Sequence, residues 1–307
     1  MEFSHVSVLL PESIDALEIK PDGVYVDCTA GGGGHAAAVL DNLSPQGRMI
    51  LIDRDPDAIA VLHERFDGDS RVTIVHDNFV NIREILNGLS VRAIDGAVAD
   101  LGVSSYQLDT PERGFSFHRD APLDMRMSRT GRTAADLVNT ASRQELAAIL
   151  RRYGEEPYAA AIASAIVRER DQQPISTTLQ LANVVSSSVP ASYKRRGHPA
   201  RRTFQALRIE VNAELESLRE ALPHLFDALK PGGVLAVITF HSLEDKIVKD
   251  YFQTLRQGCT CPPDFPVCVC GNKPKAVVKS RGIKAGEAEV EENNRSRSAK
   301  LRTAKKL

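Results

Sequence analysis

The sequence lacks a long apolar run and a large net charge. No stretch approaches the roughly 20 apolar residues needed to span a bilayer. The N-terminal segment has neither the basic start nor the apolar length of a signal peptide. We therefore expect a cytoplasmic protein with no membrane partner. A net charge of −1 excludes a chain that is basic as a whole, so any nucleic-acid contact must come from local basic patches.

Cysteine is scarce, and four of the five cysteines stand together in the segment CTCPPDFPVCVC. In a reducing compartment such a cluster is more often reduced or metal-bound than disulfide-bonded. Its thiols, Cys259, Cys261, Cys268 and Cys270, would suffice for tetrahedral zinc, although CxxC pairs would be the stronger signature. We leave zinc as an open question and assign no metal site. Cys28 stands in an apolar run and is expected to be a small buried hydrophobic residue.

The remaining composition, 42% hydrophobic and 26% charged, is that of an ordinary globular protein with one large or two smaller domains. Apolar runs and amphipathic stretches alternate over the first hundred residues. This alternation predicts a parallel, doubly wound α/β sheet with its ligand at the carboxyl ends of the strands. The expected strands are 24–28, 48–52, 71–76 and 94–99, and the expected helices between them are 36–43, 56–65 and 81–89.

The first expected strand runs into four consecutive glycines at the start of a helix. Such a loop lets the backbone approach a ligand and offers free N–H groups to an anionic group. Asp53 ends the next strand, where an acid would accept ribose hydroxyls. Asp77 and Asp100 follow the third and fourth strands, so three acids reach the same edge of the sheet. This recurrence predicts a nucleotide-type ligand site.

The alternation stops after residue 108, and 109–199 holds helical patterns without a convincing strand. We expect a helical insertion that recognises the substrate, with helices at 134–153, 156–170 and 178–187. A long amphipathic pattern follows at 204–229, with a kink or break expected at Pro223. The segment KPGG is expected to end that helix before a fifth strand at 234–240. The α/β core is therefore discontinuous, formed by 1–108 and 200–307, and its basic end at 294–307 is irregular.

Two cofactors fit the glycine loop. Gly31, Gly33 and Ala36 match the dinucleotide pattern GxGxxG/A, so a nicotinamide oxidoreductase has to be considered. The chain has no second βαβαβ half to hold the nicotinamide. In addition, KPGG leading into a hydrophobic fifth strand resembles the class I S-adenosylmethionine (SAM) methyltransferases. We therefore favour SAM over NAD.

Nine segments resemble the bacterial 16S rRNA cytosine-N4 methyltransferases of the MraW family, in order from residue 5 to residue 302. They are HVSVLLPES, DCTAGGGGH, LIDRDPDAI, DLGVSSYQLD, ERGFSF, PLDMRM, RRTFQALRIEVNAEL, FHSLEDKIVK and NRSRSAKLR. The resemblance implies a Rossmann-like SAM-binding core with a helical insertion. It also implies methyl transfer to the exocyclic N4 of a cytidine in the decoding region of 16S rRNA, within the small ribosomal subunit. The oligomeric state, and the choice between naked rRNA and assembled subunit, stay open.

The resemblance also implies a set of SAM contacts. The residues themselves support the glycines and Asp53 independently, whereas Phe79 is equally expected as a core residue that begins the next helix. In the family Asp53 contacts the ribose and Phe79 the adenine. The full set is Gly33, Gly34, His35, Asp53, Phe79, Asp100 and Gln107, the last two near the methionine end or the transfer site.

The N4 amine of cytosine is a poor nucleophile, because its lone pair is delocalised into the ring. The site must align the amine with the methyl group and accept hydrogen bonds from it. Our hypothesis is that Asp100, with the backbone carbonyls of 101–103, supplies the acceptors; that Asp100 only binds SAM is equally open. His241 is a second candidate catalytic residue, although Ser242 and Asp245 beside it also fit a helix-capping box.

Three basic clusters are candidates for phosphate contact. They are Lys194, Arg195, Arg196, Arg201 and Arg202; Arg126, Arg129 and Arg132; and the tail 295–306. An alternative function is a non-catalytic ribosome-assembly factor that uses the same fold only to bind RNA. The intact glycine loop, Asp53 and Asp100 argue against that alternative.

Overall fold

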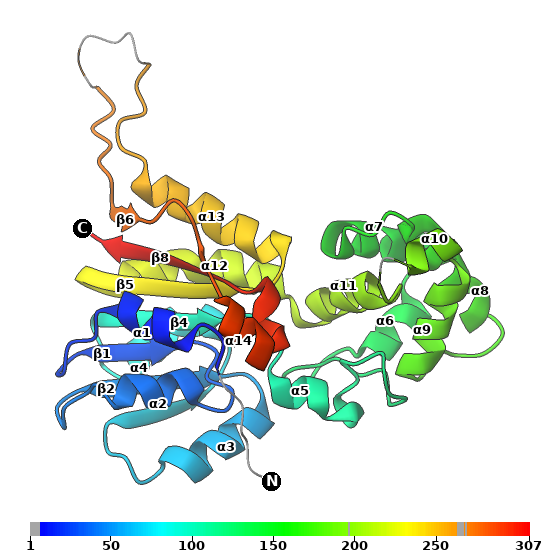
Figure 1. Cartoon of the computed structure of the whole chain (residues 1–307), viewed down its shortest axis with the longest axis horizontal. Helices are drawn as coiled ribbons and strands as arrows, with labels where there is room; N and C mark the ends of the chain where they lie inside the picture. Colours follow the sequence, from blue (N-terminus) through cyan, green and yellow to red (C-terminus); the bar gives the residue numbers. More distant parts are fainter. Residues whose placement is uncertain (1–6, 196, 263–266, 268) are drawn as a thin grey trace. The chain divides into compact units, whose positions relative to one another are not determined.

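The computed structural model describes residues 7–195, 197–262, 267 and 269–307. The chain separates into two compact units (Figure 1), the first formed by Met1–Gly102 and Leu215–Leu307 and the second by Val103–Glu214. The second unit is longer than the insertion predicted at 109–199. The difference arises because helix α11 (Arg201–Asn212), which we expected in the core, packs against the helices of the second unit.

An eight-stranded sheet forms the centre of the first unit, in the order β3-β2-β1-β4-β5-β8-β6, with β7 paired to β8. Neighbouring strands among β1 to β5 are parallel, whereas β8 runs antiparallel to its partners. The predicted parallel, doubly wound sheet is thereby confirmed. The strands are β1 (Val24–Asp27), β2 (Arg48–Asp53), β3 (Val72–His76), β4 (Ile94–Asp100), β5 (Leu229–Thr239), β6 (Ala276–Val278), β7 (Ile283–Lys284) and β8 (Lys300–Lys306).

Helices cover both faces of this sheet (Figure 1). Apolar side chains of α4, α12 and α13 pack on one face, and those of α1, α2 and α3 pack on the other. Burial on both faces explains why the central strands are near-continuous apolar runs. The helices are α1 (Leu10–Leu17), α2 (Gly34–Leu40), α3 (Pro56–Phe66), η1 (Phe79–Asn81), α4 (Ile82–Gly88), α12 (Glu214–Ala228), α13 (Ser242–Arg256), α14 (Glu287–Glu292) and η3 (Asn294–Ser298).

The break in the long amphipathic pattern falls at Ala213, so the prediction of a break at Pro223 is wrong. Ala213 has a φ of 48°, a left-handed conformation that ends α11, and α12 then begins and runs through Pro223. Both helices bury one apolar face, so the three- and four-residue spacing continues across the break. Hydrophobic spacing alone therefore does not separate them.

The KPGG segment belongs to β5 and does not precede it, contrary to our expectation. Leu229 pairs with Ile94, but the next paired residue of β5 is Val234, opposite Gly96, so residues 230–233 form a bulge. Gly232 occupies a positive φ of 80° there. Lys230 Nζ lies 2.6 Å from Asp95 Oδ2 and attaches the bulge to β4.

The basic C-terminal segment is a sheet strand, which the sequence analysis missed. In β8, Arg302 Nε donates to Asp245 Oδ1 at 2.6 Å and Lys300 Nζ donates to Asp245 Oδ2 at 2.7 Å. Lys306 Nζ donates to carbonyls at the end of α12, and Lys305 pairs with Glu18. These cations have partners within the chain, which argues against the phosphate contacts expected of them.

The second unit is helical, as predicted, although the pattern at 134–153 forms two helices. Its ERGFSF and PLDMRM segments form a loop held by buried polar side chains. Arg113 Nη2 donates to the carbonyls of Arg126 and Met127, both at 2.9 Å, and Asn212 Oδ1 accepts from Met127 N at 2.8 Å. The helices are α5 (Ser105–Asp109), η2 (Pro111–Arg113), α6 (Ala134–Thr140), α7 (Arg143–Gly154), α8 (Ala159–Arg170), α9 (Thr178–Ser187), α10 (Ala191–Lys194) and α11.

In the described ranges, no helix combines the length and the apolarity needed to cross a bilayer. The longest, α12 and α13, have 15 residues each. Cys28 is buried in the core, as expected.

Candidate active site at the carboxyl edge of the sheet

The glycine loop joins β1 to α2, and its glycines have different roles. A side chain at Gly33 would strike the Phe66 ring, and one at Gly34 would strike the Ser7 hydroxyl. Packing inside the protein therefore explains both glycines that we predicted as SAM contacts. Gly31, at a φ of 51°, faces open space, because a Cβ there would meet nothing nearer than a carbonyl oxygen at 3.8 Å. Gly31 is therefore open to a ligand.

His35, another predicted contact, is a buried residue of α2. Its Nε2 lies 3.1 Å from the carbonyl oxygen of Val8, so the ring contacts the N-terminal segment. Leu9 N in turn donates to Glu289 Oε1 of α14 at 2.8 Å. The His35 side chain thus helps to attach this segment beside the glycine loop.

Asp53 ends β2, as predicted, and its carboxylate binds the glycine loop. Oδ2 accepts from Gly31 N at 2.8 Å, and Oδ1 accepts from Asp55 N at 2.8 Å. Burial raises the pKa of Asp53 to about 6, although these backbone N–H groups oppose the rise. Each carboxylate oxygen accepts more than one hydrogen bond, so Asp53 has capacity for ribose hydroxyls as well.

Asp100 ends β4, next to β1, and its carboxylate is poorly satisfied. Asp100 N donates to the Thr29 hydroxyl at 2.7 Å, which attaches this strand end to the glycine loop. Oδ1 of Asp100 is buried and has no hydrogen-bond partner among the described residues. Burial, and then the negative charges of Asp27 and Glu244, raise the pKa of Asp100 well above its usual value.

Asp27 is a site residue that the sequence analysis did not single out. It ends β1, is 2% exposed, and accepts from Thr29 N at 3.1 Å. Burial, together with the charge of Asp53, raises the pKa of Asp27 to about 7. The available signal was its position, because Asp27 ends a strand at the same edge as Asp53 and Asp100.

The acids Asp27, Asp53 and Asp100 together suit a cationic ligand. Burial raises the pKa of each carboxyl group and so disfavours its ionised form, which a cationic ligand beside it would favour. SAM carries a sulfonium centre and an ammonium group, and both charges would be stabilised beside ionised carboxylates. The residues present therefore fit the predicted cofactor, and the anionic phosphates of a dinucleotide would be repelled.

His241 follows β5 and is the N-cap of α13, whereas we expected Ser242 to hold that position. Its Nδ1 accepts from Glu244 N at 3.4 Å, and Glu244 Oε2 accepts from Phe240 N at 2.8 Å. Asp245, which we placed in the capping box, instead pairs with β8. His241 Nε2 lies 3.1 Å from Glu244 Oε1, outside hydrogen-bond geometry. The capping geometry accounts for Nδ1 of this histidine, and its catalytic role stays a prediction.

A groove of about 440 Å³ opens beside His241 at the end of β5. Its lining includes Ser242 and the three cations Lys246, Lys249 and Lys300. Lys246 and Lys300 pair with Asp250 and Asp245, respectively. The groove is therefore a mixed-charge surface adjoining the N-terminus of α13.

The remaining predicted contacts occupy different environments. Phe79 begins η1 and is half-buried, packed against the core below β3, so its other side is accessible. Asp77 Oδ1 accepts hydrogen bonds from Asn78 N and Asn81 Nδ2. The Asp77 carboxylate therefore stabilises the turn that contains Phe79. Gln107 lies in the second unit, where it completes the capping box of α5 with Ser104. The loop glycines, His35, Asp53, Phe79 and Asp100 thus belong to the first unit, whereas Gln107 belongs to the second.

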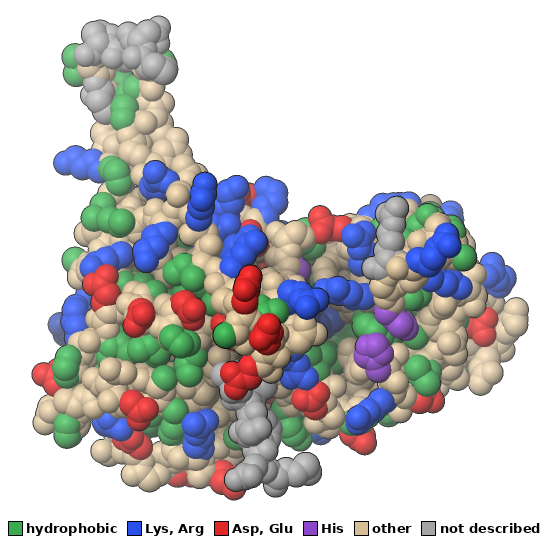
Figure 2. Space-filling model, viewed as in Figure 1, with side chains coloured by type: hydrophobic (Ala, Val, Ile, Leu, Met, Phe, Trp, Pro, Cys, Tyr) green, Lys and Arg blue, Asp and Glu red, His purple; other side chains and the backbone are tan. Residues whose placement is uncertain are grey.

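The second unit carries a half-buried phenylalanine ring and two exposed histidine rings next to one of the predicted basic clusters. The rings of Phe117 and His198 stack with centroids 4.3 Å apart, and His118 lies 4.4 Å from Phe117. Burial and the neighbouring His118 lower the pKa of His198. Lys and Arg side chains gather over the α10 end of this unit (Figure 2). These rings escaped the sequence analysis because residues 117 and 198 are far apart in the chain.

The basic residues of this unit differ in availability. Arg126 forms an ion pair with Asp124 at 2.7 Å, and Arg202 Nη1 donates to the carbonyl of Glu155 at 2.6 Å. Lys194, Arg195 and Arg201 are exposed. Arg196 lies outside the described residues.

Comparison with known proteins places these features in a family. The model of the MraW methylase family matches residues 2–307. The chain is 51% identical over 309 residues to ribosomal RNA small subunit methyltransferase H of Clostridium botulinum, covering 100% of both chains. It is 54% identical over 312 residues to the protein of the same name from Citrifermentans bemidjiense, covering 100% of this chain and 99% of the relative. A solved rRNA methylase from Streptococcus thermophilus is 12% identical, with a TM-score of 0.42 over 97% of this chain and 93% of that chain.

These matches extend over the whole length of the chain and confirm the expected enzyme class, a methyltransferase, with SAM as its cofactor. The acids and the glycine loop at the carboxyl edge of the sheet agree with that cofactor. The chain belongs to the MraW methylase family.

Proposed function

We propose that this enzyme transfers a methyl group from SAM to the exocyclic N4 of a cytidine in the decoding region of 16S rRNA. The state of the Asp100 carboxylate supports this proposal most strongly. Asp100 lies beside the glycine loop, and its buried Oδ1 has no hydrogen-bond partner among the described residues. An acceptor in this state is suited to the N–H groups of an exocyclic amine.

The first unit holds the cofactor. Bound SAM supplies an electrophilic methyl group. Asp53 accepts hydrogen bonds from the ribose hydroxyls, and the accessible side of Phe79 contacts the adenine. The open space at Gly31 lets the ligand lie close to the protein backbone. Asp27 and Asp100 stabilise the positive charges. Gly33 and Gly34 shape the loop through their contacts with Phe66 and Ser7.

Asp100 also acts on the amine. Accepting a hydrogen bond from N4 orients its lone pair and favours the tetrahedral geometry that the attacking nitrogen must reach. Burial raises the pKa of Asp100, so its ionised form depends on a nearby cation such as the sulfonium of bound SAM; in that form the carboxylate can also accept the proton that the amine loses. His241 is the alternative acceptor, but its Nδ1 is engaged as the N-cap of α13.

The second unit recognises the RNA. Relatives that are half identical to this chain are named ribosomal RNA small subunit methyltransferases, which supports a substrate in the small subunit. Lys194, Arg195 and Arg201 contact phosphates, and the Phe117–His198 pair offers a face on which an unstacked base can rest. The reaction takes place in the cytoplasm, where the small subunit is assembled.

A transfer assay with labelled SAM tests this function. We expect label to enter small subunits from cells that lack this enzyme, and not large subunits or already modified small subunits. The Asp100→Asn enzyme serves as the matched control for catalysis. Tight binding of small subunits without any transfer would instead identify a non-catalytic assembly factor. Calorimetric binding of NADH in place of SAM would contradict the cofactor.

A further inference from the structure

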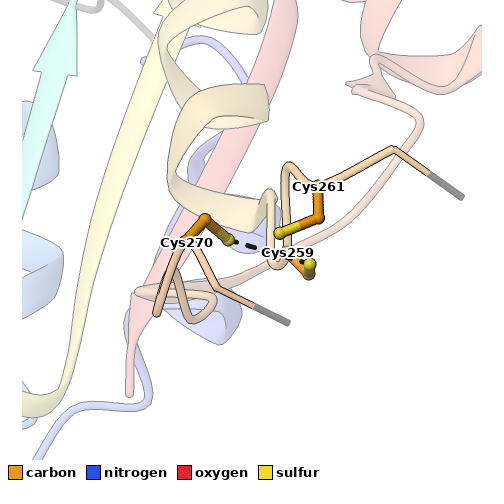
Figure 3. Close-up of side chains that lie close together, drawn as sticks. All are labelled: Cys259, Cys261 and Cys270. Carbon is orange, nitrogen blue, oxygen red and sulfur yellow. Dashed lines mark hydrogen bonds between the residues drawn. The ribbon is translucent and has the colours of Figure 1, made fainter. Parts of the chain in front are cut away.

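The segment between α13 and β6 is a cysteine-rich extension that takes no part in the proposed reaction. We propose that Cys259, Cys261 and Cys270 bind a zinc ion. Their side chains converge from the two arms of the extension (Figure 3), and their Sγ atoms all lie within 4.8 Å of one another. Cys268 lies outside the described residues and is not part of the inferred site.

The spacing of the sulfurs agrees with tetrahedral zinc. Zinc–thiolate bonds of roughly 2.3 Å at tetrahedral angles place two sulfurs about 3.8 Å apart. In the structure the Sγ atoms of Cys270 and Cys259 are 3.7 Å apart. A disulfide would require about 2.05 Å, so these side chains are placed as metal ligands are and not as a disulfide.

Backbone N–H groups surround the sulfurs. Thr260 N and Asn272 N donate to Cys270 Sγ at 3.4 and 3.5 Å, and Val269 N donates to Cys261 Sγ at 3.4 Å. Hydrogen bonds of this kind stabilise negative charge on sulfur and orient thiolate ligands. Each donor lies within two residues of a cysteine of the cluster. The backbone is therefore folded around these sulfurs.

The described residues of the extension form no hydrophobic core that could hold the cysteines together. None of its described residues between 257 and 275 is buried, and Val267 and Val269 are 69% and 73% exposed. Asn272 Nδ2 donates to the carbonyl of Gly258 at 2.7 Å and closes the base of the two arms. A segment without a hydrophobic core needs a cross-link to stabilise its fold. In a reducing compartment, a metal ion bound by thiolates can be that cross-link.

Metal titration of the full chain tests the site. The protein is purified without a metal-binding tag, under reductant, stripped with chelator, and titrated with Co²⁺ and then with Zn²⁺. We expect one Co²⁺ per chain, with the visible bands of a tetrahedral site and a sulfur-to-cobalt charge-transfer band, and stoichiometric displacement by Zn²⁺.

Serine variants identify the ligands. Cys259→Ser and Cys270→Ser should each weaken zinc binding by more than the roughly 10–100-fold cost of losing an outer-shell partner. Cys28→Ala removes a thiol elsewhere and should keep the cobalt spectrum. Circular dichroism and SAM affinity, both expected to match the wild type, show that the variants are folded.

Three results would overturn the site. They are the absence of a charge-transfer band in the reduced full chain, a band that survives in both serine variants, and a Cys259–Cys270 disulfide in protein kept under reductant. Trypsin digestion offers a readout apart from spectroscopy. Zinc should slow cleavage after Lys275 in the wild type, but should not change the rate of cleavage in Cys270→Ser.

Discussion

Asp27, Asp53 and Asp100 end three neighbouring strands, and burial raises the pKa of each. Buried acids without a neighbouring cation lower the stability of the folded protein, and such destabilising groups are common at functional sites. Of the three, Asp53 and Asp100 could be predicted because each directly follows an apolar strand. Asp27 was missed because it stands within the glycine-loop motif and looks like part of the strand.

Replacement of Asp100 tests its contact with the amine. Asp100→Asn keeps the shape of the side chain but removes the charge and replaces one acceptor by a donor. We expect kcat to fall by about 10²–10³-fold, the usual effect of losing one group that stabilises the transition state. Asp67→Asn, an exposed acid paired with His63, is the matched control and should retain wild-type kcat. Full turnover in Asp100→Asn would exclude the catalytic role.

The pH dependence of stability follows from the raised pKa values. With folded-state values of about 7 for Asp27 and about 6 for Asp53, the folded chain holds more protons than the unfolded chain above roughly pH 4. The ligand-free protein should therefore lose stability as pH rises from about 4 to 7. Thermal denaturation across this range measures the effect, and Asp27→Asn should raise the melting temperature at pH 8.

SAM binding should show the opposite dependence. The cation requires ionised carboxylates, so we expect the dissociation constant at pH 5.5 to be at least about tenfold higher than at pH 8. Calorimetry at the two pH values, with Asp67→Asn as control, makes the measurement. Equal affinity at both pH values would show that these acids do not face the cofactor.

Strand β8 allows a test of how much its ion pairs with Asp245 contribute to the stability of the sheet. Burial works to raise the pKa of Asp245, but its bonds to Arg302 and Lys300 outweigh burial and lower it. Arg302→Ala would leave this acid with one partner, and we expect a loss of about 2 kcal/mol in the free energy of unfolding.

Lys305→Ala is the control for that variant, because Lys305 pairs with Glu18 at the exposed surface. Its loss should cost less than about 0.5 kcal/mol. Urea denaturation of both variants gives the comparison. Equal stabilities would mean that the Asp245 pair contributes nothing to the attachment of β8.

The elements also show where sequence reasoning succeeds. The first four strands could be predicted because burial on both faces demands apolar runs. Strand β8, KLRTAKK, could not, because its charges are satisfied by Asp245 and Glu18, far away in the sequence. The N-cap at His241 was missed because serine is the commoner capping residue. The local pattern around Gln107 fits a helix-capping box and gives no sign of a ligand contact, so only the family resemblance named it as one.

For the whole molecule, the proposed RNA contact predicts a salt dependence. A triple variant, Lys194→Ala, Arg195→Ala and Arg201→Ala, removes exposed cations only. We expect the slope of log affinity for the small subunit against log salt to become shallower by about 2, since each phosphate contact contributes roughly 0.7–0.9. SAM affinity should stay unchanged. An unaltered slope in filter-binding measurements would remove this cluster from the interface.

We propose that the enzyme methylates the exocyclic nitrogen of one cytidine in 16S rRNA. The most direct measurement is mass spectrometry of nucleosides from small subunits that the enzyme has methylated in vitro. We expect a single modified cytidine, located in the decoding region, with the added methyl on the base and attached to N4. A methyl group on the ribose, on C5 or on another nucleotide would contradict it.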